Sequence, residues 1–192
     1  IEALRAATGK KYLELIHRID RDTSGLVMIS KKRSTLKLVQ DLLREHKIQK
    51  TYAAIVKGQV SLDQQLIDAP LFRYELANGE RRVRVSKEGK PSKTDWKVVE
   101  RFKTATLVHA SPLSGRTHQI RVPGLSIGHP LVGDDKYGHK TDDKGPEARR
   151  LCLQAMRLES TNYTSIEAPM PEDMQQVINE LRKQKGVKIS NW

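Results

Sequence analysis

The sequence predicts an α+β domain built on one mixed, mostly antiparallel central sheet with flanking helices. Several short strand-like segments follow one another, separated by Gly, Asn, Asp and Pro. Consecutive strands joined by short turns pair in the antiparallel direction. Amphipathic helical patterns lie toward both ends of the chain. Because the chain has 192 residues and no linker-like stretch, we expect residues 1–192 to form a single domain.

The first fifty residues combine helical and strand-like patterns. The chain opens at Ile1, without methionine and inside a helical pattern, so we expect a fragment of a longer protein. A mainly apolar run over residues 12–19 precedes a polar turn and a strand-like run over residues 26–29. Ser34 is a candidate N-cap for a helix through His46. That helix should pack on apolar neighbours because four apolar residues share one face: Leu36, Val39, Leu42 and Leu43.

The rest of the chain is dominated by strand patterns. We expect strands at residues 51–56, around Leu66, and at 82–85, 96–99, 105–108, 151–158 and 164–168. A helical pattern starts at residues 117–122, and Pro171 begins a C-terminal amphipathic helix through about Lys183. The polar segment 138–150 is typical of a mobile surface loop.

The composition indicates a polyanionic partner. Thirty-five Lys and Arg residues against 23 Asp and Glu give a net charge of +12, which favours RNA or DNA over a purely solubilising surface. The single cysteine, Cys152, lies in an apolar run and is expected to be buried, as in a cytoplasmic protein. Neither a signal peptide nor an apolar run of the ~20 residues that a membrane span requires is visible, so we expect no membrane association.

Asp20 is the most conspicuous candidate for chemistry. It lies on a predicted loop between Arg18 and Arg21, and the basic segment with Arg116 and Arg121 could converge on it. Positive neighbours suit a nucleophilic or ion-paired carboxylate. The simpler interpretation is that Asp20 caps a turn or balances the arginines.

Metal and nucleotide sites fit the sequence poorly. Residues 20–25 imitate the start of a calcium-binding EF-hand loop, but Lys31 stands where the loop requires Glu. One cysteine and six scattered histidines provide no zinc-ligand spacing. No Walker A loop is present. We therefore expect no metal site and no nucleotide-binding loop.

Longer motifs identify a family. The segment His17-Arg18-Ile19-Asp20-Arg21-Asp22-Thr23-Ser24-Gly25-Leu26 resembles the signature of the RluA-type RNA pseudouridine synthases. Lys50-Thr51-Tyr52 is similar to the family's tyrosine-bearing strand, and residues 115–122 to its basic motif, followed by Gly128-His129-Pro130 and Gly133-Asp134. Residues 78–85 and 89–92 most resemble the subgroup called ribosomal large-subunit pseudouridine synthase C.

The resemblance implies a fold, a reaction and residue roles. It implies the pseudouridine synthase fold, with Asp20 as the catalytic aspartate, Tyr52 as the active-site tyrosine and Arg121 as the partner of the aspartate. RNA would be contacted by four residues: Arg18, Arg21, Arg116 and His118. The implied substrate is a uridine of 23S ribosomal RNA, flipped into the site at a cost of a few kcal/mol. The reaction that the resemblance implies needs no cofactor, because it rearranges one nucleotide without a redox change. We expect the chain to be a fragment that lacks the family's small N-terminal RNA-binding domain, and to be a monomer.

The sequence leaves several alternatives open. Asp20 attacks C6 of uracil or C1′ of ribose, or assists an elimination; Tyr52 stacks on the base or also removes a proton. The RNA is alternatively a transfer RNA, or the chain is a non-catalytic RNA-binding module. A glycoside hydrolase would need a second carboxylate about 5 to 10 Å away, for which Asp22 is the candidate. Finally, Pro123 and Gly124 depart from the family pattern, and we expect them to kink or end the helix just after Arg121.

Overall fold

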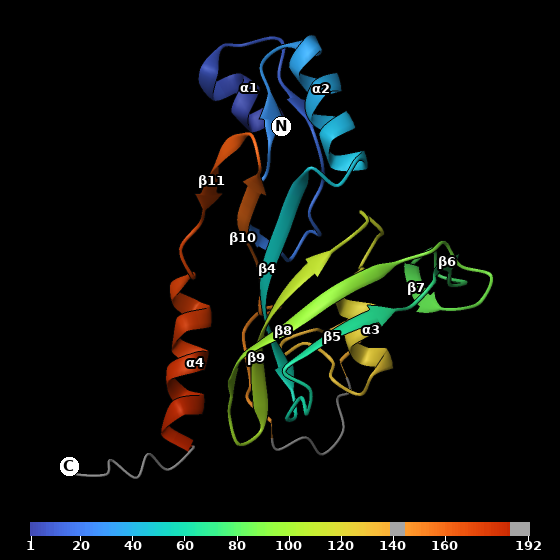
Figure 1. The fold of residues 1–192 in the computed structure, drawn as a ribbon, viewed down its shortest axis with the longest axis vertical. Coiled ribbons are helices and arrows are strands. Elements are labelled where there is room, and N and C mark those ends of the chain that lie inside the picture. The colour runs from blue at the N-terminus through green and yellow to red at the C-terminus, as the bar shows by residue number, and fades with distance from the viewer. Residues whose placement is uncertain (139–144, 185–192) are drawn as a thin grey trace.

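The structure is a computed structural model that describes residues 1–138 and 145–184, and a seven-stranded sheet forms its centre (Figure 1). The strand order is β11-β10-β4-β9-β8-β5, and the short β2 pairs with β10. All neighbours along that path are antiparallel, whereas β2 and β10 are parallel. The predicted mixed, mostly antiparallel sheet is therefore confirmed. Its strands are β2 (Ser24–Gly25), β4 (Ile48–Lys57), β5 (Gln64–Asp68), β8 (Lys93–Arg101), β9 (Ala105–Pro112), β10 (Leu153–Ser160) and β11 (Tyr163–Glu167).

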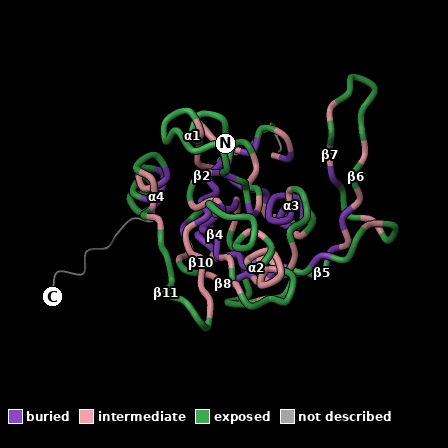
Figure 2. The backbone as a smooth tube through the Cα atoms, turned by 90° about the horizontal axis from the view of Figure 1, so that it is seen from above, coloured by how far each residue is buried: buried purple, intermediate pink, exposed green. Residues whose placement is uncertain are grey.

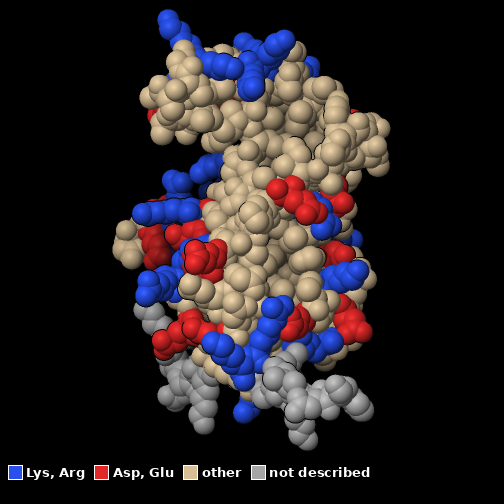
Figure 3. All heavy atoms as spheres, turned by 90° about the vertical axis from the view of Figure 1, so that its left-hand side faces the viewer, with Lys and Arg blue, Asp and Glu red and all other residues tan. Residues whose placement is uncertain are grey.

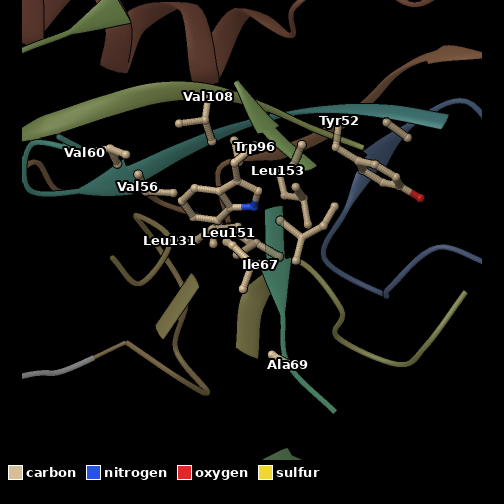
Figure 4. Close-up of a cluster of buried hydrophobic side chains, with 14 residues drawn as sticks. Tyr52, Val56, Val60, Ile67, Ala69, Trp96, Val108, Leu131, Leu151 and Leu153 are labelled. Atoms are coloured by element: carbon tan, nitrogen blue, oxygen red, sulfur yellow. The ribbon is translucent and has the colours of Figure 1, made fainter. Parts of the chain in front are cut away.

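The central strand β4 is buried on both faces of the sheet. Residues 51–56 are all buried, because side chains alternate between two separate cores. Val56 and Ala54 pack in one core around Trp96, which Figure 4 shows in the middle of its apolar neighbours. Ile55 and Ala53 face the other core. Because β4 is buried on both faces, Tyr52, which lies on this strand, has a fixed position.

The second core is covered by the C-terminal helix α4 (Glu172–Gln184) (Figure 1). The buried residues of α4 recur at helical spacing and pack against β4 and its neighbours: Met174, Val177, Ile178 and Leu181. Pro171 precedes the first helical residue, as predicted, and its carbonyl accepts a hydrogen bond from Gln175 N at 2.9 Å. Cys152 is buried in this core, also as predicted.

The N-terminal segment lies at one end of the sheet and contains α1 (Glu2–Thr8), β1 (Glu14–Leu15), β3 (Ile29–Ser30) and α2 (Arg33–Arg44) (Figure 1). The predicted N-cap at Ser34 is wrong, because the helix begins at Arg33, and Lys32, two residues before Ser34, occupies the cap position without a side-chain cap bond. The apolar face of α2 is only partly covered, and none of its residues is fully buried.

The predicted strand at residues 26–29 is also wrong. The backbone there changes partner: Leu26 N donates to Ala155 O of β10 at 2.9 Å, whereas Met28 O accepts from Ile16 N at 3.0 Å. The result is two short strands, β2 and β3, in place of one. A Cβ on Gly25 would lie 2.1 Å from Ala155 O, so only glycine permits this approach to β10.

A two-stranded hairpin of β6 (Leu71–Glu75) and β7 (Arg81–Val85) projects from the body of the protein, where Figure 2 shows it as largely exposed. The strand pattern predicted β7 but not β6, whose sequence Leu-Phe-Arg-Tyr-Glu carries charges among its apolar residues.

The helix α3 (Arg121–Ser126) corrects two further predictions. Residues 117–120 form turns rather than helix, and α3 begins at Arg121 and continues through Pro123 and Gly124 instead of ending there. Proline is tolerated because Pro123 lies in the first turn, where backbone N–H groups have no partner inside the helix. Gly124 lets α3 approach the core, since a Cβ there would lie 3.2 Å from the Trp96 ring.

Two expectations concern the outside of the fold. Of the segment 138–150 predicted as a mobile loop, residues 139–144 lie outside the described residues, and 145–150 form neither helix nor strand. In the described ranges, none of the helices has the length and apolar character needed to cross a bilayer.

Candidate active site

Segments that are distant in sequence meet at one pocket of about 60 Å³. Four are distant from one another in sequence: the loop between β1 and β2, strand β4, the connection from β9 to α3, and the start of β10; the β9–α3 connection contributes both its loop and its turn. Five of the seven residues singled out in the sequence line the pocket: Arg18, Asp20, Tyr52, Arg116 and His118.

Asp20 is held in this pocket by a loop that is fixed at both ends. Its carbonyl accepts a hydrogen bond from Thr23 N at 3.0 Å. Beyond the loop, β2 is fastened to β10, where the Ser24 hydroxyl also donates to the Gln154 amide. The Asp20 side chain remains 23% exposed, so its carboxylate faces the pocket and stays accessible. Asp22 is exposed and does not line the pocket, which removes the second carboxylate that a glycoside hydrolase would require.

Arg121 approaches Asp20 but forms its strongest bonds with Asp134. Its Nη1 lies 3.7 Å from Asp20 Oδ2, while its Nε and Nη2 donate to the two oxygens of Asp134, both at 2.8 Å. The side chain of Arg121 is 6% exposed and that of Asp134 is fully buried. Such a bidentate pair fixes the guanidinium plane, so Arg121 offers a fixed positive charge to Asp20 without locking the Asp20 oxygens.

Asp134 is a site residue to which the sequence interpretation gave no role, although Gly133-Asp134 was among the recognised phrases. Its Oδ1 also accepts backbone hydrogen bonds from Lys136 and Tyr137, both at 3.0 Å. Burial alone would raise the pKa of Asp134, but the hydrogen bonds and charge of Arg121 lower it below its ordinary value. For Arg121 burial opposes the change, and the bonds and charge of Asp134 raise the pKa.

Tyr137 connects this ion pair to the projecting hairpin. Arg121 lies over its ring, with 5.2 Å between the guanidinium carbon and the ring centre. The Tyr137 hydroxyl lies 2.6 Å from His118 Nδ1 and accepts a hydrogen bond from Val83 N of β7 at 3.0 Å. His118 adopts a left-handed backbone conformation with φ of 54°. Burial lowers the pKa of His118, and the nearby Asp20 carboxylate opposes that shift.

Tyr52 lies where the main core meets the pocket. It is 9% exposed, and Figure 4 shows it at the edge of the cluster with its hydroxyl pointing away from Trp96. Burial, and to a smaller extent the charge of Asp20, raises the pKa of Tyr52 to about 12. The phenol is therefore neutral at physiological pH, which makes it a stacking surface and a hydrogen-bond donor rather than a ready base.

Two further residues were missed by the sequence interpretation. Gln119 is buried and fastens the loop after β9 to β8: its Oε1 accepts from Ser114 Oγ at 2.8 Å and from Arg116 N at 2.9 Å, and its Nε2 donates to Lys93 O at 2.9 Å. Lys50 extends from β4 to the pocket wall, and burial lowers its pKa. Both lie within phrases that were recognised, but their isolated residue types gave no sign of the contacts.

Charge is distributed unevenly over the molecule. On the face in Figure 3, basic and acidic side chains are interspersed over the lower half. The pocket instead has three basic residues with Asp20: Arg18, Lys50 and Arg116. Arg21 lines an adjoining groove toward the β6–β7 hairpin, together with Arg73 and Arg81. The described residues include no cluster of three or more His, Cys, Asp or Glu side chains suited to a metal ion.

Comparison with known proteins gives matches along the sequence. The family model described as RNA pseudouridylate synthase matches residues 1–123. A ribosomal large subunit pseudouridine synthase C of Pasteurella multocida is 46% identical over 195 residues, which cover 97% of this chain and 60% of the relative. The protein of the same name from Escherichia coli K12 is 46% identical over 193 residues, covering 95% and 60%. The chain thus spans about 60% of the length of these relatives.

Comparison with solved structures shows the fold. Human RNA pseudouridylate synthase domain containing 4 superimposes with a TM-score of 0.75 at 23% identity, covering 93% of this chain and 80% of that one. Human RNA pseudouridylate synthase domain containing 1 gives 0.72 at 24% identity, covering 93% and 83%. The fold predicted from the sequence motifs is therefore confirmed.

Proposed function

Because the chain belongs to the RNA pseudouridylate synthase family, we propose that it isomerises uridine to pseudouridine in 23S ribosomal RNA. The observation that carries the proposal is an accessible Asp20 carboxylate in a pocket lined by the buried Tyr52, with the fixed Arg121 at 3.7 Å from that carboxylate. The name of the relatives, which refers to the ribosomal large subunit, supports the choice of RNA.

The arrangement suits an intramolecular transfer. Pseudouridine formation replaces an N-glycosidic bond by a C-glycosidic bond within one nucleotide, so atoms and electrons balance without a redox partner. Asp20 acts on the uracil C6 or the ribose C1′, or assists an elimination at the sugar, after which the base turns and reattaches through C5. Tyr52 holds the base by stacking during that turn.

Arg121 keeps the site polarised while leaving Asp20 reactive. Its two best bonds go to Asp134, so only Nη1 faces the catalytic carboxylate, at 3.7 Å. A nucleophile held in a bidentate pair would have to break two charge-assisted hydrogen bonds before reacting. Because Asp134 takes these two hydrogen bonds, Asp20 can react without breaking them.

The basic residues around the pocket serve the RNA backbone. We assign Arg18, Arg21 and Arg116 to phosphate contacts and His118 to the displaced nucleotide, since a stacked uridine is reached only after flipping. We also propose that residues 1–192 act as one catalytic domain, as a monomer, in the cytoplasm.

Formation of pseudouridine on 23S transcripts, without added metal or nucleotide, tests the function. We expect the parent to modify discrete uridines, and Asp20→Ala and Asp20→Asn to be folded but inactive. Asp22→Asn is the matched control, because this neighbouring exposed carboxylate does not line the pocket. A parent that binds transcripts without modifying them would support a binding module instead, and modification of transfer RNA alone would reassign the substrate.

A further inference from the structure

A second cavity of about 500 Å³ lies beside the catalytic pocket, between the end of α2, the start of β4 and the loop after β9. The two cavities share a wall made of Lys50, the last residue of β9 (Pro112) and three residues of that loop: Ser114, Gly115 and Arg116. A ligand in one cavity is therefore in immediate contact with the wall of the other. The second volume falls in the range of sites that enclose small organic ligands, about 300–1,000 Å³.

The lining of the second cavity is basic and apolar, with no acidic side chain. Arg44 and Arg116 supply permanent positive charge, whereas Leu43, Ile48 and Pro112 supply apolar surface. An RNA nucleotide has the matching composition, since it carries one anionic phosphate and one planar base.

Lys50 occupies the shared wall as a partly buried cation without a counter-ion. Its side chain makes no ion pair or hydrogen bond with any residue in the described ranges. Burial lowers the pKa of Lys50, which expresses the cost of holding the charge there. A charge that is withdrawn from water is costly unless an opposite charge compensates it, and a phosphate at the shared wall would provide that compensation.

We propose that the second cavity binds the nucleotide next to the target uridine, with Lys50 on the phosphate that joins the two. The proposal rests on the RNA substrate assigned above and deepens it. The neighbouring base lies against the apolar wall of Leu43, Ile48 and Leu113, and its recognition there helps to hold the flipped uridine in the catalytic pocket.

The phosphate contact is tested with a short hairpin of 23S RNA that the chain binds and that contains a single uridine as the target, whether or not that uridine is modified. Single phosphates, on either side of the target or far from it, are replaced by neutral methylphosphonates. For the parent we expect about a tenfold loss of affinity at one flanking position and a much smaller loss at the distant one. Equal losses at all positions would overturn the proposal, whatever the variants do.

Lys50→Met identifies the residue responsible. On unmodified RNA we expect about a tenfold weaker Kd and a salt dependence reduced by about one counter-ion. On the sensitive methylphosphonate RNA the variant should lose nothing further, because both changes remove the same contact. Lys97, an exposed lysine on β8 outside both cavities, provides the matched control. Any effect of Lys97→Met on Kd should add to the effect of the methylphosphonate. If the losses of affinity from Lys50→Met and from the methylphosphonate add in full, the assignment of Lys50 to this phosphate is overturned.

The base contact is tested by removing the neighbouring base. Leu113, which lines the second cavity and is 44% exposed, is changed to Ser; Leu62, 55% exposed and outside the lining, is the control. We expect Leu113→Ser to weaken binding of intact RNA but not of RNA with an abasic neighbour. Fluorescence anisotropy measures Kd without turnover. RNA that is bound with the expected losses of affinity but is not modified contradicts only the proposed function. RNA that is modified, but for which the losses from the variants and from the altered RNA add in full, contradicts only this inference.

Discussion

The buried pair of Arg121 and Asp134 gives the sharpest prediction about stability. Asp134→Asn keeps the shape of the side chain and one oxygen for the backbone hydrogen bonds of Lys136 and Tyr137. It removes the negative charge and puts an NH₂ group in place of Oδ2, which accepts from Arg121 Nε at 2.8 Å, while the oxygen at the Oδ1 position still accepts from Arg121 Nη2. Arg121 then becomes a buried cation whose remaining carboxylate, Asp20, is 3.7 Å away.

Breaking a buried ion pair from one side typically costs about 3–5 kcal/mol. We expect a loss of about 3 kcal/mol, at the lower end, because Asp20 and the retained turn bonds still compensate in part. Against a total free energy of unfolding of about 5–15 kcal/mol, this is a large fraction. With a urea dependence of about 2 kcal/mol/M, the unfolding midpoint should fall by about 1.5 M.

Urea unfolding, followed by circular dichroism, measures the effect. Asp173→Asn is the matched control, since Asp173 also holds an arginine, Arg150, through two hydrogen bonds of 2.5 and 3.0 Å but at the surface. Its loss should cost no more than about 1 kcal/mol. Asp20→Asn should likewise lower the free energy of unfolding by no more than about 1 kcal/mol, but it should abolish activity. Equal midpoints for the parent and Asp134→Asn would refute the reasoning that Asp134 carries the charge of Arg121.

Three further predictions concern single side chains. Burial, aided by the charge of Lys50, lowers the pKa of His17 from 6.5 to about 4. As the pH falls, His17 is therefore protonated in the unfolded chain before it is protonated in the folded one. The folded state should lose stability on the order of 2 kcal/mol, allowing for partial exposure of the side chain, as the pH falls from 6.5 to about 4. His17→Gln should flatten the pH dependence of the urea midpoint, and an unchanged slope would contradict this. Gly124→Ala should destabilise by about 1–3 kcal/mol in thermal unfolding because its Cβ meets the core, whereas Gly115→Ala, with no atom closer than 3.9 Å, should change little. With a pKa of about 12, Tyr52 should add no limb to the pH–rate profile below about pH 10; a limb that disappears in Tyr52→Phe would show otherwise.

Local patterns predicted the elements whose residues obey one simple periodicity. The strand at residues 51–56 and the helix after Pro171 were found because alternation and helical spacing are properties of neighbouring residues. The errors occurred where a distant contact decides the local structure. Gly124 looked like a helix breaker, yet its missing side chain is what lets α3 lie against Trp96. Residues 26–29 looked like one strand, but β10 and the segment before Asp20 divide its hydrogen bonds.

The sequence by itself determined the family, the positions of Asp20, Tyr52 and Arg121, and the basic character of the molecule, because each is contained in contiguous phrases or in composition. Only the tertiary structure decided which carboxylate forms hydrogen bonds with Arg121 and which remains accessible. Asp134 lies 13 residues from Arg121 and takes both of its strong hydrogen bonds, which leaves Asp20 accessible. Lys50 and the loop after β9 meet only when β4 and β9 pair, and their meeting creates the second cavity. Ion pairing and cavities depend on distances in space, and no local pattern of residues encodes such distances.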